Sequence, residues 1–123
     1  MATLKSERAI LKDVGAKPHP NSGRGQFKKG DGSDDMFVID VKEAAKSFTL
    51  NMGVWKKICS DSYKTDPYKH PQLLIVFGEY DKKYLSVIET DVLNALQSDI
   101  RFMAEQLGAA MKELNELRGN DNS

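Results

Sequence analysis

A short apolar run that ends in two opposite charges constrains the fold more than any other stretch of the chain. Met36 to Ile39 is apolar and leads directly into Asp40, Val41 and Lys42. The short length and the β-branched and aromatic content predict a strand. Because side chains alternate between the two faces of a strand, Asp40 and Lys42 point to the same face. Buried charges are costly unless they are paired or bind a metal, so we expect a site at this strand end.

Length and composition predict one ordinary globular domain with a core of its own. The chain has 123 residues, of which 40% are hydrophobic and 29% charged, and this is enough for a core without disulfides. The single cysteine, Cys59, excludes an internal disulfide and suits a reducing compartment such as the cytoplasm. There is no apolar run of about 18 residues and no apolar N-terminal segment, so neither a membrane span nor secretion is expected.

The net charge of zero hides an uneven distribution along the chain. Residues 1–31 carry seven basic and three acidic side chains, and residues 41–72 carry six and three. Residues 79–123 carry five basic and nine acidic side chains. A polyanionic partner would therefore approach the first two-thirds of the chain, although an ordinary solvated surface gives similar counts.

Periodicity and turn residues predict an α/β core over residues 1–89, with a mixed central sheet flanked by helices. A first helix is expected from Thr3 to Val14 and ends at Gly15. The remaining expected elements are the central strand ending at Lys42, a short strand Ser47–Leu50, a helix Met52–Tyr63, a buried strand Gln72–Phe77 and a strand Lys83–Ile88.

A long C-terminal helix with a heptad pattern is predicted from Thr90 to Arg118, followed by a disordered tail over residues 119–123. Its apolar residues recur at alternating spacings of three and four, the a/d pattern of a coiled coil. We expect this helix to serve packing or dimerisation, with its far half against another chain. The alternative is a helix that folds back or breaks at Gly108. The apolar positions are Leu93, Leu96, Ile100, Met103, Leu107, Ala110, Leu114 and Leu117.

Two aspartates and a lysine predict a site for a hard divalent cation and an activated water. Asp31 lies between Gly30 and Gly32, where a tight turn could aim its carboxylate at Asp40. Carboxylate oxygens bind Mg²⁺, and the carbonyl of Val41 is a possible third ligand. Lys42 could hold the attacking water or a phosphate.

Two further residues bear on this metal site. Glu7 could complete the ligand shell if the first helix packs across the sheet edge. A lone glutamate on a helix is more often simply solvated. His19 could be a ligand, but no second His or Cys has suitable spacing.

The segment from Lys17 to Gly32 is rich in Pro, Gly, Ser and Lys, which predicts an irregular loop. Its positive charge and free backbone N–H groups could wrap a phosphate backbone. It could equally be a simple connection.

The ordered set of motifs resembles the PD-(D/E)xK nuclease superfamily, and more narrowly the Holliday junction resolvases and their phage-encoded relatives. The resemblance covers residues 7 to about 88. Two features depart from the pattern: Asp40 stands where this branch more often has Glu, and the C-terminal helix is not a standard part of the fold. The motifs are Glu7-Arg8, Ser22-Gly23-Arg24, Lys29-Gly30-Asp31, Ile39-Asp40-Val41-Lys42, Lys46-Ser47-Phe48, Trp55-Lys56-Lys57-Ile58 and Pro71 to Phe77.

The resemblance implies a restriction-endonuclease-like fold, with Glu7, Asp31 and Asp40 binding the metal and Lys42 as the catalytic lysine. It implies Mg²⁺ as cofactor, with Mn²⁺ as a substitute, branched DNA as substrate, and a homodimer acting in DNA recombination and repair, in the host cytoplasm if the chain is phage-encoded. The alternatives are a nuclease for nicked or generic duplex DNA, or a DNA-binding or assembly module that does not cleave. The DNA-binding residues would be Arg8, Ser22, Arg24, Lys28, Lys29, Lys46, Ser47, Lys56 and Lys57.

Overall fold

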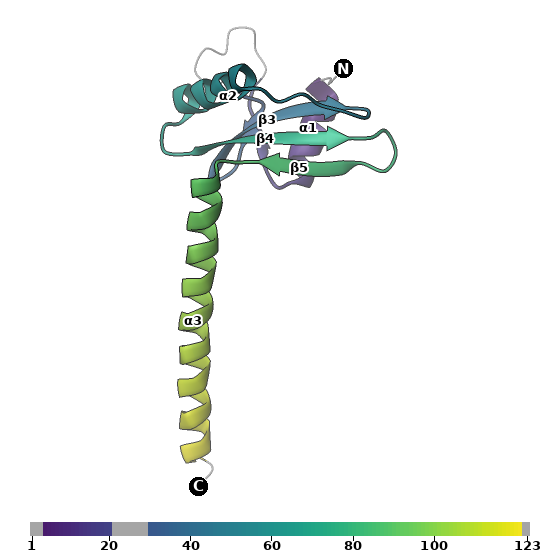
Figure 1. Cartoon of the computed structure of the whole chain (residues 1–123). Helices are drawn as coiled ribbons and strands as arrows, with labels where there is room; N and C mark the ends of the chain where they lie inside the picture. The colour runs from purple at the N-terminus through teal and green to yellow at the C-terminus, as the bar shows by residue number, and fades with distance from the viewer. Residues whose placement is uncertain (1–3, 21–29, 122–123) are drawn as a thin grey trace. The chain divides into compact units, whose positions relative to one another are not determined.

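The structure is a computed structural model that describes residues 4–20 and 30–121. The chain forms two compact units, an N-terminal unit from Met1 to Ile88 and a C-terminal unit from Glu89 to Ser123. In the described ranges, the N-terminal unit contains a mixed sheet and two helices, and the C-terminal unit contains one long helix (Figure 1). The coarse prediction of an α/β chain with a mixed sheet and a long C-terminal helix is confirmed.

Within the described residues, the sheet has five strands in the order β1-β2-β3-β4-β5. The central pair, β3 (Phe37–Ala44) and β4 (His70–Phe77), is parallel, and every other neighbouring pair is antiparallel. β5 (Lys83–Val87) forms one edge. The other edge consists of two strands of two residues each, β1 (Lys17–Pro18) and β2 (Gly32–Ser33), which the sequence pattern did not predict.

Helix α1 (Leu4–Asp13) covers one face of the sheet. Its last residue is Asp13, one residue before the predicted end, and Gly15 follows with a φ of 76° in the left-handed region that glycine adopts without strain. Its residues Ile10 and Leu11 are buried together with Ile39, Val41, Leu74 and Val76 of the two central strands.

The opposite face is covered by helix α2 (Met52–Thr65), which connects the two parallel strands. Alternation along β4 turns Leu73 and Ile75 toward α2, where they pack with Ile58. By the same alternation and the register of the parallel pair, Asp40 and Lys42 lie on the α2 face of β3. The two central strands therefore have a core on each face, and the charged pair belongs to the α2 side.

The predicted strand from Ser47 to Leu50 is wrong. These residues have no regular secondary structure and lead from the end of β3 into α2, where the side chain of Asn51 accepts a hydrogen bond from the N–H of Val54 at 2.9 Å. Phe48 still packs against the core on the α2 face. The apolar pattern therefore reflected packing, whereas a strand also needs a neighbour to pair its backbone.

Helix α3 (Thr90–Asp121) is continuous through Gly108 and extends three residues beyond the predicted end at Arg118. The helical residues Gly119 to Asp121 correct the prediction that the tail begins at residue 119, and residues 122–123 lie outside the described part. A single glycine costs about 1 kcal/mol in a helix, which is not enough to stop one of this length. None of the helices in the described part of the chain is long and apolar enough to cross a membrane.

Candidate functional site

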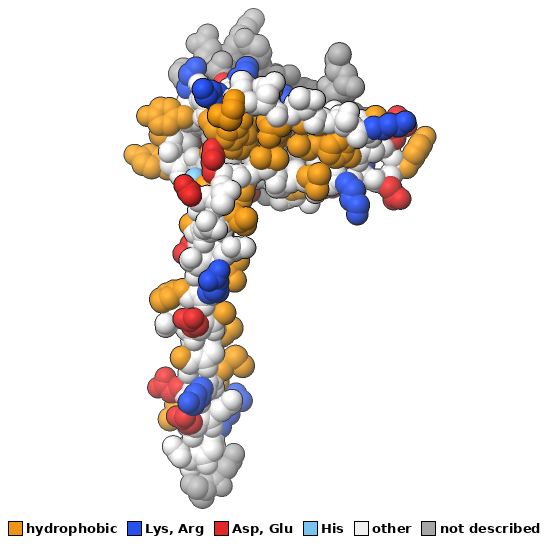
Figure 2. Space-filling model, in the orientation of Figure 1, with side chains coloured by type: hydrophobic (Ala, Val, Ile, Leu, Met, Phe, Trp, Pro, Cys, Tyr) orange, Lys and Arg blue, Asp and Glu red, His pale blue; other side chains and the backbone are white. Residues whose placement is uncertain are grey.

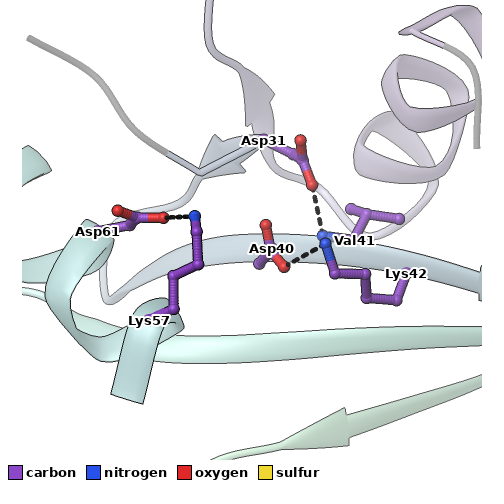
Figure 3. A network of polar contacts seen from close by, with 6 residues as sticks. All are labelled: Asp31, Asp40, Val41, Lys42, Lys57 and Asp61. Carbon is purple, nitrogen blue, oxygen red and sulfur yellow. Dashed lines mark hydrogen bonds and ion pairs between the residues drawn. The ribbon is translucent and has the colours of Figure 1, made fainter. Parts of the chain in front are cut away.

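Asp31 lies in a sharp turn that directs its side chain at the edge of β3. Gly30 has a φ of 76°, and the N–H of Asp31 donates to the carbonyl of Ile39 at 2.9 Å. Because β2 begins at Gly32 and pairs only as far as Ile39, no strand among the described residues lies beside the edge of β3 beyond that point. The Oδ2 atom of Asp31 fills this gap and accepts a hydrogen bond from the N–H of Val41 at 2.6 Å (Figure 3).

Asp40 and Lys42 form an ion pair along one face of β3. The Nζ atom of Lys42 lies 3.2 Å from Oδ2 of Asp40, and the side chains of Lys42 and Asp40 are 44% and 20% exposed respectively. The predicted side-by-side placement of carboxylate and ammonium is therefore present, and the ammonium remains within reach of solvent.

The three predicted carboxylates form a chain with Asp31 in the middle. Burial raises the pKa of Asp31 most, the hydrogen bond from Val41 lowers it, and the nearby Glu7 carboxylate raises it further. Burial also raises the pKa of Asp40, and the charge of Asp31 adds to that increase while Lys42 opposes it. Asp31 thus interacts both with Glu7 from α1 and with Asp40 of β3.

The placement of these carboxylates limits how a metal could bind. Among the described residues, no group of three or more His, Cys, Asp or Glu side chains is placed to hold a metal ion. Mg²⁺, however, is commonly held by one or two carboxylates together with water and substrate phosphate. Asp31 and Asp40 repel each other in a half-buried place, and a cation between them would remove that repulsion. The donor set therefore fits Mg²⁺ bound mainly by these two residues.

The carbonyl of Val41, the predicted backbone ligand, lies on the edge of β3 where it could help to bind a metal. A strand residue directs its N–H and C=O toward the same edge. Since the N–H of Val41 donates to Asp31, its carbonyl also lies on the edge that faces Asp31. Val41 can therefore stay in the proposed ligand set.

Lys57 of α2 reaches the same neighbourhood from the other side of Asp40 (Figure 3). Its Nζ atom lies 2.9 Å from Oδ2 of Asp61, and its side chain is 79% exposed. The hydrogen bond and charge of Asp61 raise the pKa of Lys57, and Asp40 contributes a smaller increase. Asp61 was not predicted as part of the site, although its spacing of four residues from Lys57 within the expected helix was a sequence signal for such a pair.

The other predicted DNA-binding residues are more scattered. Arg8 is exposed on α1, Lys56 is exposed on α2, and Lys46 and Ser47 are exposed after the end of β3. Nothing in the described residues ties these four side chains into one surface. Ser22, Arg24, Lys28 and Lys29 lie outside the described residues.

His19 is a buried residue that the sequence suggested only as a weak metal ligand. Its ring is 6% exposed, with Nδ1 3.2 Å from the carbonyl of Gly30 and Nε2 3.0 Å from Oγ of Ser33. A carbonyl only accepts, so Nδ1 carries the proton and a neutral ring accepts from Ser33 through Nε2. Its backbone N–H donates to the carbonyl of Asp31 at 2.9 Å. His19 therefore positions the turn that carries Asp31.

Gly32 is a second positioning residue, because there is no room for a side chain at this position. A Cβ atom there would lie 2.6 Å from the carbonyl oxygen of Lys17 and 2.9 Å from both methyl groups of Leu11. The sequence signal for it was the paired glycines around Asp31, which predicted a tight turn without identifying this close approach.

Comparison of the chain with protein-family models, with curated proteins and with solved structures found no match. The assignment of a function therefore rests on the residues and on their geometry.

Proposed function

We propose that the chain is a metal-dependent, structure-selective endodeoxyribonuclease that hydrolyses phosphodiesters at four-way (Holliday) DNA junctions. The observation that carries the proposal is the meeting of Glu7, Asp31, Asp40 and Lys42, which come from a helix, a turn and a strand and are separated by up to 35 positions in the sequence. Carboxylates whose pKa is raised by burial and by a neighbouring charge, as it is for Asp31 and Asp40, are common at functional sites.

In this proposal Asp31 and Asp40 hold the metal, with Glu7 behind Asp31 and the Val41 carbonyl beside it. A bound Mg²⁺, or Mn²⁺ in its place, would acidify a water molecule and neutralise charge on the phosphate. Oδ2 of Asp31 is held by the N–H of Val41, so the other carboxylate oxygen points in a defined direction. The enzyme therefore does not need to reorganise this carboxylate when substrate arrives.

Lys42 stabilises the charge that develops on the attacked phosphate. Its ammonium is held by Asp40 but is 44% exposed, so it can contact a phosphate oxygen without a large movement. Lys57, which is paired with Asp61 on the other side of Asp40, can bind a neighbouring phosphate of the same DNA strand. The two lysine ammonium groups beside the carboxylates would attract an anionic substrate, and the substrate would supply further oxygen ligands to the metal.

The preference for a branched substrate is supported by the resemblance to junction resolvases and by the lack of evident base-reading groups near the site in the part of the chain that the structure describes. Contacts to phosphates carry no sequence information, so selectivity would come from the shape of the DNA. A nuclease for nicked or generic duplex DNA would use the same catalytic residues, and the assay has to separate the two.

The test is cleavage of a synthetic four-way junction, a nicked duplex and a linear duplex of matched length, each with Mg²⁺ and with EDTA. We expect paired nicks near the branch only with Mg²⁺. Lys42→Ala and Asp31→Asn should each lower the cleavage rate about 100-fold or more while leaving junction binding intact. Lys64→Ala and Asp35→Asn, which change the same residue types elsewhere in the N-terminal unit, are the matched controls.

Equal cutting of all three DNAs would replace the junction-specific proposal with a general nuclease. Junction binding without cutting in either Mg²⁺ or Mn²⁺ would identify a non-cleaving module. Normal cleavage by either site variant would show that the catalytic residues lie elsewhere.

A further inference from the structure

The C-terminal unit presents an apolar stripe that one helix cannot bury on itself. Ile100 and Leu107 of α3 are each 62% exposed, and Leu114 is 48% exposed. Figure 2 shows hydrophobic side chains along the length of the helix, with charged side chains between them. Helices in water depend mainly on packing of such a face for their stability, so this stripe calls for a partner.

The spacing of the stripe fits another helix better than it fits a sheet. Its eight positions from Leu93 to Leu117 alternate steps of three and four, an average period of 3.5 residues. This period keeps the stripe facing a partner helix along its whole length. The stripe spans about 36 Å at 1.5 Å per residue, whereas the longest strands of the sheet have eight residues and span about 26 Å.

We propose that α3 pairs with α3 of a second copy of this chain as a parallel, two-stranded coiled coil. Leu93, Ile100, Leu107 and Leu114 occupy the a positions, and Leu96, Met103, Ala110 and Leu117 occupy the d positions. None of the d positions carries isoleucine, which shifts such helices toward trimers and tetramers, and Ile100 places at an a position the β-branched residue that favours two strands. The proposal is independent of DNA cleavage, because it uses no residue of the catalytic site.

The a and d positions form the seam between the two helices, and the few charged residues beside it determine whether the helices pair parallel or antiparallel. In this register the g positions include Asp99 and Glu113, and the e positions include Arg118. A parallel pair brings each g position beside the e position five residues on in its partner. Glu113 of each helix then faces Arg118 of the other, which gives two attractive pairs per dimer.

An antiparallel pair whose two stripes overlap along their full length would bring like charges together. Leu93 would face Leu117 of the partner, and the g positions of the two helices would face each other. Asp99 would then lie beside Glu113 of the partner, and this repulsion would occur twice. Arg118 would have no acidic residue among the flanking positions opposite it. The sequence of α3 therefore favours the parallel direction.

The test is sedimentation equilibrium of the full chain, comparing wild type with Glu113→Arg. In a parallel dimer the new guanidinium lies beside Arg118 of the other helix and is repelled, whereas in an antiparallel dimer it lies beside Asp99 and is attracted. We expect the dissociation constant to rise about tenfold, since each of two exposed pairs changes from attraction to repulsion. The double variant Glu113→Arg with Arg118→Glu should return the dissociation constant to near the wild-type value.

Leu107→Glu places a charge in the seam and should abolish the dimer, whereas Ala109→Glu places the same charge outside the seam and should not. Circular dichroism of each variant checks that the N-terminal unit remains folded. A tighter dimer for Glu113→Arg would overturn the parallel direction. A wild-type chain that stays monomeric at every concentration, or dimers unaffected by Leu107→Glu, would overturn the coiled coil.

Discussion

At the scale of single residues, the two aspartates of the site carry an electrostatic cost. Burial raises the pKa of both Asp31 and Asp40 from the ordinary value of 3.8, and each also feels a neighbouring carboxylate. The folded chain therefore binds more protons than the unfolded chain as the pH falls toward this value. By linkage, these groups lower the stability of the fold as the pH rises through the window between 3.8 and their raised pKa values.

Asp31→Asn removes one of these charges while keeping an oxygen that can accept from the N–H of Val41. In EDTA we expect the variant to unfold at a higher urea concentration than wild type at pH 7, and the difference to shrink in acid as the wild-type carboxyl becomes protonated. Urea unfolding at neutral and acidic pH measures this, with Asp35→Asn as the control at an exposed position. A variant that is less stable than wild type at pH 7 would mean that the charge of Asp31 is compensated in the fold.

At the scale of elements, alanine substitutions at two glycines test the packing at the turn that carries Asp31 and the continuity of helix α3. Gly32→Ala introduces a Cβ atom against the Lys17 carbonyl and Leu11, so α1 or β1 must shift. We expect a loss of about 1–3 kcal/mol in the free energy of unfolding and a drop in cleavage, because the same shift displaces Asp31. Gly108→Ala has open space around it within α3 and should stabilise the helix by about 1 kcal/mol.

Thermal and urea unfolding of the two variants measures these opposite signs, and the junction assay measures the effect on cleavage. Full stability and full activity of Gly32→Ala would show that the close approach at Gly32 is unimportant. A Gly108→Ala chain of lowered stability would mean that the helix is bent or packed closely at that position.

The long, strongly patterned elements could be predicted from sequence, and the elements defined by pairing could not. The apolar run of β4 and the heptad stripe of α3 have local patterns that determine their structure. The two-residue strands β1 and β2 have no such pattern, because only contact with β3 creates them. The Ser47–Leu50 prediction was wrong for the converse reason, since its apolar residues pack on the α2 face without backbone pairing.

The same distinction applies to the site. Asp40 and Lys42 could be placed side by side from strand periodicity alone, and the glycines around Asp31 predicted its turn. The order of contact, with Asp31 between Glu7 and Asp40, depends on where α1 packs and could not be deduced. His19 has no sequence signal for its role, because the two oxygens bound by its ring come from Gly30 and Ser33, more than ten residues away.

At the scale of the whole molecule, a parallel dimer would give a junction-cutting enzyme two equivalent sites, one in each chain. Cutting a four-way junction symmetrically requires two nicks, and a twofold dimer supplies one site for each. The charges beside the α3 seam allow mixed dimers to be made, and these test whether each site cuts one DNA strand. Chains with Glu113→Arg and chains with Arg118→Glu each repel their own kind, whereas a parallel mixed pair places arginine beside glutamate on both sides of the seam.

If the second chain also carries Lys42→Ala, each mixed dimer has one intact site. We expect such dimers to nick one strand of a four-way junction and to leave the opposite strand uncut, whereas mixed dimers with both sites intact should give paired nicks. Denaturing gels with each strand labelled in turn distinguish these products. Paired nicks from dimers with a single intact site would show that one site cuts both strands, and the need for a twofold arrangement in cleavage would then disappear.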